Sequence, residues 1–116
     1  MSRAKKALTI WVGNTNEFRF RLKQNAETPL DLTGSTIVMT IVHGGDQIVL
    51  SSAAEEISID DPTSGEFVVP ISVEQSRSVQ PSPGAGIQYE IERRIDGKQT
   101  TIIYGSISLA GGNNAD

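Results

Sequence analysis

The chain has 116 residues, of which 37% are hydrophobic and 21% charged, and it contains no cysteine. This length fits one domain with one buried core, and the composition differs from that of disordered chains. The net charge of −4 at pH 7 argues against a broad attraction to nucleic-acid phosphates. The missing cysteine excludes disulfides, thiolate nucleophiles and cysteine metal clusters.

The two ends of the chain differ in composition from its middle. Segment 1–7 is basic and predicts a flexible extension, and the Gly/Asn-rich segment 111–116 predicts a flexible tail. The apolar run 8–12 is too short for an export signal or a membrane span. We therefore expect synthesis in the cytoplasm, no membrane contact and a single domain over residues 8–110.

The first strand signals are segments 8–12 and 17–23. In the second, apolar residues alternate with three cations, which is the two-residue period of a half-buried strand. These cations form an outward basic stripe, Arg19, Arg21 and Lys23. Such a stripe either contacts an acidic partner or only solubilises the strand and discourages edge pairing.

The next strand signals are segments 36–43, 47–51, 56–60 and 66–72. Segment 36–43 is apolar on both faces, which predicts a central strand or one that a partner covers. Within segment 66–72, Pro70 lacks an amide hydrogen and therefore predicts an edge strand or a bulge. We interpret that edge as a place where another chain docks.

After these strands, the spacing of Ser72 and Gln75 predicts a capping box and one short helical turn. Asp96-Gly97 then predicts a type I′ hairpin between strands 86–95 and 98–109. Because helix signals are scarce, the sequence predicts an all-β fold, a single antiparallel β-sandwich of Ig-like or Greek-key type. It would have about 7–9 strands and at most one short helical turn.

The last strand has an ambiguous apolar register. Ile102 and Tyr104 share one parity, whereas Ile103 and Ile107 share the other, so we predict a bulge at Gly105. One of the two apolar sets is then exposed to a partner.

Residues with chemical potential are few. His43 is the only histidine, and without a cysteine it forms neither a usual zinc site nor a cysteine dyad. We interpret it as a hairpin-end residue. Asp60 and Asp61 lack EF-hand spacing and favour a turn, with calcium as a minor option. Glu90 and Glu92 lie beside an arginine and favour surface ion pairs over a glycosidase carboxylate pair. We predict no enzyme, no metal and no cofactor.

The aromatic residues complete the candidate set. Tyr89 lies on the core parity, whereas Trp11 and Tyr104 are candidates for an interface. A sugar platform needs clustered, exposed rings, so a glycan ligand is the less favoured alternative. The candidate protein-interface residues are Trp11, Arg19, Arg21, Lys23, Pro70, Ile102 and Tyr104.

Three segments resemble a known family. They are 29–36 (Pro-Leu-Asp-Leu-Thr-Gly-Ser-Thr), 59–67 (Ile-Asp-Asp-Pro-Thr-Ser-Gly-Glu-Phe) and 86–91 (Gly-Ile-Gln-Tyr-Glu-Ile), followed by the turn at Asp96-Gly97. Together they resemble the small β-sandwich of tailed-bacteriophage tail and baseplate proteins, and most of all the N-terminal domain of the baseplate upper protein family. The resemblance covers residues 8–110 and rests on turn and strand signatures.

Members of that family anchor receptor-binding parts to the tail and continue into a stem, whereas this chain ends at Asp116. The resemblance therefore implies a virion adaptor or ring component, assembled in the host cytoplasm. Its partners would be itself, as a ring or trimer, and other tail or baseplate proteins, without nucleic acid or membrane. The alternatives are a head-decoration or head-to-tail connector protein, a carbohydrate- or host-surface-binding module, and a bacterial Ig-like adhesin domain.

Overall fold

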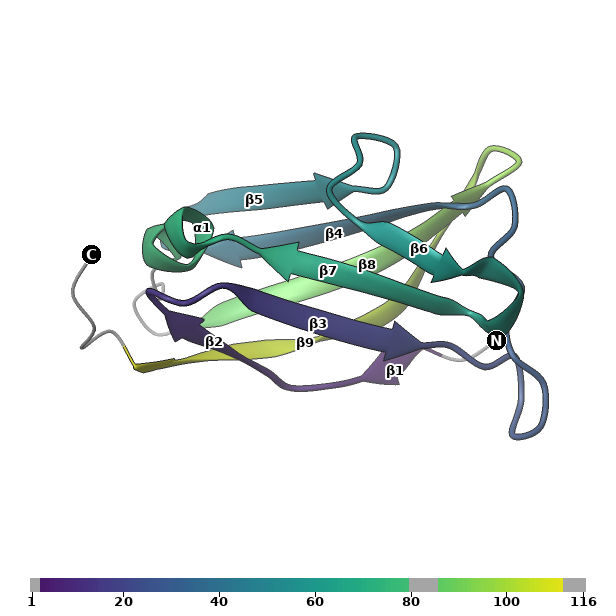
Figure 1. Ribbon diagram of the computed structural model, residues 1–116, viewed down its shortest axis with the longest axis horizontal. Helices are drawn as coiled ribbons and strands as arrows, with labels where there is room; N and C mark the ends of the chain where they lie inside the picture. Colours follow the sequence, from purple (N-terminus) through teal and green to yellow (C-terminus); the bar gives the residue numbers. More distant parts are fainter. Residues whose placement is uncertain (1–2, 80–85, 112–116) are drawn as a thin grey trace.

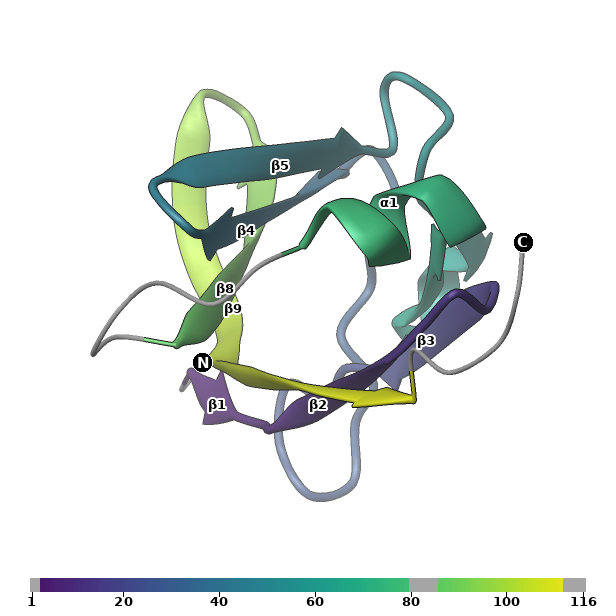
Figure 2. The same cartoon turned by 90° about the vertical axis from the view of Figure 1, so that its left-hand side faces the viewer.

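The computed structural model describes residues 3–79 and 86–111, and this part of the chain is mostly β-structure in two sheets. The six-stranded sheet contains β1 (Ala4–Lys5), β2 (Leu8–Val12), β4 (Thr36–His43), β5 (Asp46–Ser51), β8 (Ile87–Ile95) and β9 (Lys98–Gly111). The three-stranded sheet contains β3 (Asn16–Arg21), β6 (Ser58–Asp61) and β7 (Glu66–Ile71). Figure 1 shows the smaller sheet in front of the larger one, and Figure 2 shows both from the end.

The larger sheet is mixed rather than purely antiparallel. Strands β4, β5, β8 and β9 form antiparallel pairs, whereas β1 and β2 both run parallel to β9. The prediction of an antiparallel fold is therefore wrong at this edge. Local alternation predicts a strand but not its direction, and a parallel pair needs a long connection. Here the rest of the domain provides that connection.

Alternate residues of both sheets contribute to one hydrophobic core. In β4 the inward residues are Ile37, Met39 and Ile41, all fully buried, and the strand lies between β5 and β8. The prediction that its two-sided apolar pattern marks a central strand is confirmed. Within the three-stranded sheet, the rings of the paired residues Phe20 and Phe67 stack with centroids 5.0 Å apart.

Pro70 is not on an edge strand, because β7 is the middle strand of the three-stranded sheet. The position tolerates proline because the neighbouring strand β6 begins at Ser58, opposite Val68, and does not extend to Pro70. The predicted edge is therefore wrong for the strand as a whole, although β6 leaves this end of β7 uncovered.

The bulge in β9 lies at Ile102 and not at Gly105. Ile91 pairs with Ile103, and the next residue of β8 pairs with Thr101, so Ile102 is the extra residue. This shift turns two consecutive isoleucines inward, and Ile102 and Ile103 are 1% and 3% exposed. Ile102 therefore belongs to the core, and its assignment as an interface residue is corrected.

Short helical turns and caps complete the fold. Helix α1 (Val73–Ser78) begins with the predicted capping box. A second short turn, η1 (Pro62–Ser64), exceeds the single helical turn that we predicted, because Pro62 at its start favours a helical φ. Asp96 and Gly97 have φ of 52° and 76°, as a type I′ turn requires, which confirms the final hairpin.

The chain ends differ from the sequence-based expectation where they are described. Ala4–Lys5 form β1 against β9 rather than a free extension. Gly111 ends β9, and the rest of the predicted flexible tail, residues 112–116, lies outside the described residues.

Candidate docking surfaces

The predicted interface residues do not form one cluster. Trp11 and Tyr104 lie in the six-stranded sheet, whereas Arg19, Arg21 and Pro70 lie in the three-stranded sheet. Lys23 follows the end of β3 and pairs with Pro29 in an isolated bridge. The candidates therefore belong to two surfaces, which are described separately.

The basic stripe on β3 meets acidic residues of its own chain. Arg19 forms ion pairs with Asp60 at 3.2 Å and with Glu17 at 3.5 Å, and Arg21 pairs with Glu66 at 3.3 Å. Exposed pairs of this kind contribute little to stability. Contact with an acidic partner, one of the two alternatives for the stripe, stays a prediction, and residues of the same chain already supply part of such an acidic surface.

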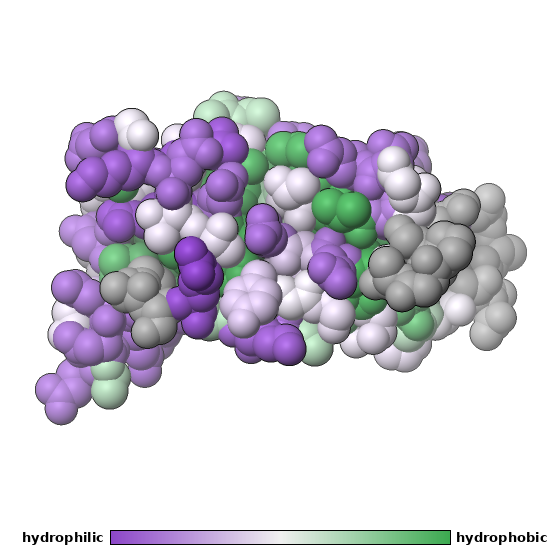
Figure 3. Space-filling view, turned by 180° about the vertical axis from the view of Figure 1, so that it is seen from behind, coloured by the Kyte–Doolittle hydropathy of each residue, from purple (hydrophilic) through white to green (hydrophobic). Residues whose placement is uncertain are grey.

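The outer face of the six-stranded sheet carries exposed apolar side chains between polar ones, as Figure 3 shows in green and purple. Val42 and Val49 are diagonal neighbours on β4 and β5 and are 48% and 49% exposed. Tyr104 on β9 is 39% exposed. In the sequence, Val42 lies on the outward-facing parity of its strand. The exposure of Val49 was not predicted, because Ile48 and Leu50 on either side of it are also apolar and the segment shows no alternation.

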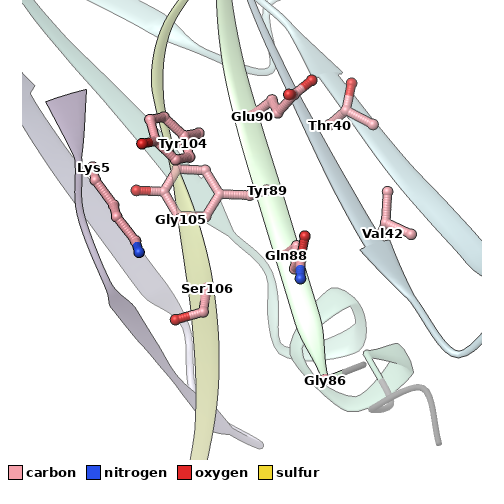
Figure 4. Close-up of a pocket in the computed structure, with 10 residues that line it drawn as sticks. All are labelled: Lys5, Thr40, Val42, Gly86, Gln88, Tyr89, Glu90, Tyr104, Gly105 and Ser106. Carbon is pink, nitrogen blue, oxygen red and sulfur yellow. The ribbon is translucent and has the colours of Figure 1, made fainter. Parts of the chain in front are cut away.

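A hollow of about 550 Å³ lies on this outer face. The strand register explains its composition, because Lys5, Tyr104, Glu90 and Thr40 occupy one row across four neighbouring strands. In Figure 4, Tyr104 lies between Lys5 and Glu90, and Val42 lies on the side of the hollow away from Lys5. The hollow thus offers a ring, an ammonium, a carboxylate and an apolar wall, a mixture suited to recognition.

A hydrogen bond from Tyr89 holds the chain at Lys6, next to the wall of the hollow that Lys5 forms. The Tyr89 hydroxyl donates a hydrogen bond to the Lys6 carbonyl at 2.6 Å, and burial raises the pKa of Tyr89 to about 12. The Lys6 amide donates to the Tyr104 carbonyl at 2.9 Å. A Cβ on Gly105 would collide with the Lys6 carbonyl oxygen. The chain at Lys6 therefore passes directly over Gly105, and this contact positions Lys5 in the wall.

The Asp-Leu-Thr-Gly segment of the family resemblance is a structural turn. Asp31 accepts a hydrogen bond from the Thr33 amide at 2.9 Å, and hydrogen bonds from the side chain and then the backbone of Thr33 lower the pKa of Asp31. Arg93 donates to the Ser35 hydroxyl and to the Asp31 carbonyl. These contacts hold the turn against β8.

The remaining residues of chemical interest have structural contacts. His43 ends β4 at the hairpin to β5, which confirms the hairpin-end interpretation, and its side chain is buried. Glu92 pairs with Arg94 at 3.0 Å, as predicted, and Asp60 accepts from Arg19 and from the Ser58 hydroxyl. Within residues 3–79 and 86–111, no three His, Cys, Asp or Glu side chains gather as a metal site.

No protein-family model matches the sequence, and no significant match to a curated protein is found. None of the helices in the described part of the chain has the length and apolar character needed to cross a membrane.

Proposed function

We infer that the two sheets are the layers of a β-sandwich of Ig-like, Greek-key type. The chain changes sheets four times, between β2 and β3, β3 and β4, β5 and β6, and β7 and β8. Inward residues of both sheets belong to the same hydrophobic cluster. Repeated crossings around one core are typical of this architecture.

We propose that the protein is a non-enzymatic virion structural protein of a tailed bacteriophage. It acts as an adaptor in the tail or baseplate that oligomerises and anchors fibre, spike or neighbouring ring proteins. The observation that carries this proposal is the outer face of the six-stranded sheet, where Val42, Val49 and Tyr104 are exposed on a regular strand ladder. Exposed apolar residues on a rigid support are typical of protein interfaces.

The adaptor works by presenting this face without changing shape. Strands β4, β8 and β9 hold their side chains in fixed register, so a partner meets a preformed surface and little ordering entropy is lost on binding. In a symmetric particle the same contact recurs in every subunit, and weak contacts then add to a stable assembly. Assembly in the host cytoplasm and a place in the virion agree with the family resemblance.

The proposal is tested by co-expressing the tagged full chain with the genes that flank its own and identifying what co-purifies. We expect a tail or baseplate protein to co-purify, and we expect Val42→Lys and Tyr104→Ala to weaken its capture. The control is Thr100→Lys, which alters an exposed residue of β9 near the hairpin end. Absence of the chain from purified particles, or capture that is unchanged by both variants, would contradict the proposal.

The hollow beside Tyr104 favours a second candidate, a glycan-binding module. Its ring, carboxylate and ammonium are groups that sugars use for stacking and hydrogen bonding. A glycan array with the full chain tests this function. We expect Tyr104→Ala to abolish any binding and Trp11→Ala to leave it intact, because Trp11 does not line the hollow. Equal loss in both variants would exclude the hollow as the sugar site.

A further inference from the structure

Strand β5 forms an edge of the six-stranded sheet that is unusually open. It pairs with β4 over six consecutive residue pairs, from Val38 with Ser51 to His43 with Asp46, without a bulge. The strand contains no lysine, arginine or proline. Figure 1 shows it at the margin of the molecule. A regular edge without these features is a template for pairing with another strand.

The other edges carry features that oppose pairing. On β2, the Asn16 side chain accepts from the Trp11 amide at 2.9 Å and donates to the Trp11 carbonyl at 3.0 Å, so it occupies the groups that a new strand would use. Strand β3 carries Glu17, Arg19 and Arg21. Strand β6 is short, ends in two aspartates and has an irregular register. On β5 the corresponding contacts, from Asp46 and Glu56, lie toward its two ends and leave Val49 between them uncapped.

The free backbone groups of β5 can be assigned from its two ends. The Ser51 amide donates to the Glu56 carboxylate, and the Ser51 carbonyl accepts from the Glu56 amide, so both groups of Ser51 point away from β4. In an antiparallel ladder this direction recurs at every second residue, which places the amide and carbonyl of Val49 and Gln47 on the same open side. The Gln47 amide contacts the Asp46 carboxylate. Val49 therefore presents an uncapped amide and an uncapped carbonyl on the open edge.

We propose that β5 pairs with β5 of a second copy of this chain, antiparallel and about a twofold axis at Ile48. The two six-stranded sheets then become one continuous sheet. This inference rests on the proposed function in one respect, the self-association of the adaptor, and it identifies the strand responsible. An axis at Ile48 follows because Glu56 occupies the edge at Ser51, which leaves residues 46–50 for pairing.

A second copy fits because the strand is complementary to itself in this register. Val49 lies opposite Gln47 of the second copy, Ile48 opposite Ile48, and Leu50 opposite Asp46. No like charges meet, and the partly buried Ile48 side chains gain cover from one another. The pairing also brings the exposed Val49 side chains of both copies together on the outer face. A twofold axis requires such an isologous contact.

The contact is small. Pairing through five residues buries less than the roughly 1,200 Å² of a stable standard-size interface. We therefore expect a dimer that dissociates in the micromolar range and that neighbouring contacts in an assembly strengthen. This weakness makes the dimer measurable by sedimentation across a concentration series.

The first experiment measures sedimentation of the full chain and of Val49→Pro. Proline at Val49 removes an outward amide but no bond to β4, so the fold should tolerate it. We expect the wild-type chain to dimerise and the variant to dimerise at least about tenfold more weakly. Val42→Lys separates edge pairing from stacking of the outer faces, because Val42 is equally exposed but lies on the inner strand β4. We expect it to retain the dimer.

The second experiment tests the register. Because the chain has no cysteine, Ile48→Cys introduces a single thiol at the proposed axis, where facing Cα atoms about 4.5 Å apart suit a disulfide. We expect Ile48→Cys to form a cross-linked dimer under mild oxidation and Val42→Cys to remain uncross-linked. Far-UV circular dichroism confirms that each variant is folded. A wild-type chain that stays monomeric, or a dimer that survives Val49→Pro, overturns the inference.

The two proposals fail separately. If the chain co-purifies with tail proteins but never dimerises through β5, the adaptor function stands and the β5 pairing is wrong. If the β5 dimer forms but no tail protein is captured, the pairing stands and the adaptor function is wrong.

Discussion

The two edges of the six-stranded sheet, at β2 and at β5, have different surroundings. Strand β2 is more apolar in sequence than β5, yet Asn16 covers its backbone at Trp11, and the Ser76 hydroxyl accepts from the Gly13 amide beyond it. The Lys6 side chain also lies over the Phe20 ring at 5.3 Å. On the open side of β5, by contrast, the contacts are those of Asp46 and Glu56 near its ends. Side-chain contacts to the edge backbone, one from the following turn at Asn16 and one from the distant Ser76, and not strand composition, decide which edge is sealed.

The largest expected effect comes from a change at Gly105 of β9, over which the chain passes at Lys6 between β1 and β2. Gly105→Ala drives a Cβ into the Lys6 carbonyl, which displaces β1 and removes the partner of the Tyr89 hydroxyl. We expect the free energy of unfolding to fall by about 3 kcal/mol. Urea denaturation measures this loss. Ser106→Ala, at the next and exposed position, should change stability by less than about 0.5 kcal/mol, and an equal effect of both variants would contradict the close approach.

Alkaline pH tests the same contact without a change at Gly105. The folded-state pKa of Tyr89 is raised to about 12, against about 10 in an unfolded chain. Below pH 10 the contribution of Tyr89 to stability is fully present. As pH rises from about 10 to 12 the unfolded chain loses its proton first, so the free energy of unfolding falls by about 2 to 3 kcal/mol in total.

Urea denaturation at a series of alkaline pH values measures this loss. Tyr89→Phe is the matched control, because it retains the ring but has no hydroxyl to ionise. The difference between the two chains should grow smaller as pH rises through this range. A constant difference would show that Tyr89 ionises equally in the folded and unfolded chains.

Asn16→Ala removes the side chain that covers the backbone of β2 at Trp11, so this edge becomes more like the open edge of β5. Asn16 is buried and bonds both the amide and the carbonyl of Trp11, so its loss leaves these groups without their partner. We expect a loss of about 2 kcal/mol in urea denaturation and an increase in self-association by sedimentation. Thr15→Ala, in the adjacent exposed turn, controls for the turn itself. A stability loss without added association would show that other features still protect β2.

Local signals in the sequence predicted the elements well. Segment 36–43 is a central strand, Ser72 and Gln75 form a capping box, and Asp96-Gly97 forms the hairpin turn. Each of these depends on neighbours within a few residues, where side-chain alternation and turn preferences act.

The features that the sequence did not predict depend on distant partners. The parallel pairing of β1 and β2 with β9 joins the two ends of the chain, and Gly105 is constrained by Lys6. The bulge at Ile102 was misplaced because a run of apolar residues fits either parity. Ile102 was consequently assigned to an interface although it is buried. Of the candidate surface, Trp11 and Tyr104 were identified by residue type, whereas the open edge at Val49 required the sheet order.

The smallest expected effect concerns β3, whose edge is protected by charge and not by a buried contact. Arg19→Ala removes two exposed ion pairs, and we expect the free energy of unfolding to change by less than about 1 kcal/mol. A double-mutant cycle with Asp60→Ala isolates the pair energy. Because Arg21 and Glu17 remain on the strand, self-association should not increase. An increase as large as that of Asn16→Ala would mean that a single exposed charge seals an edge as well as a buried amide.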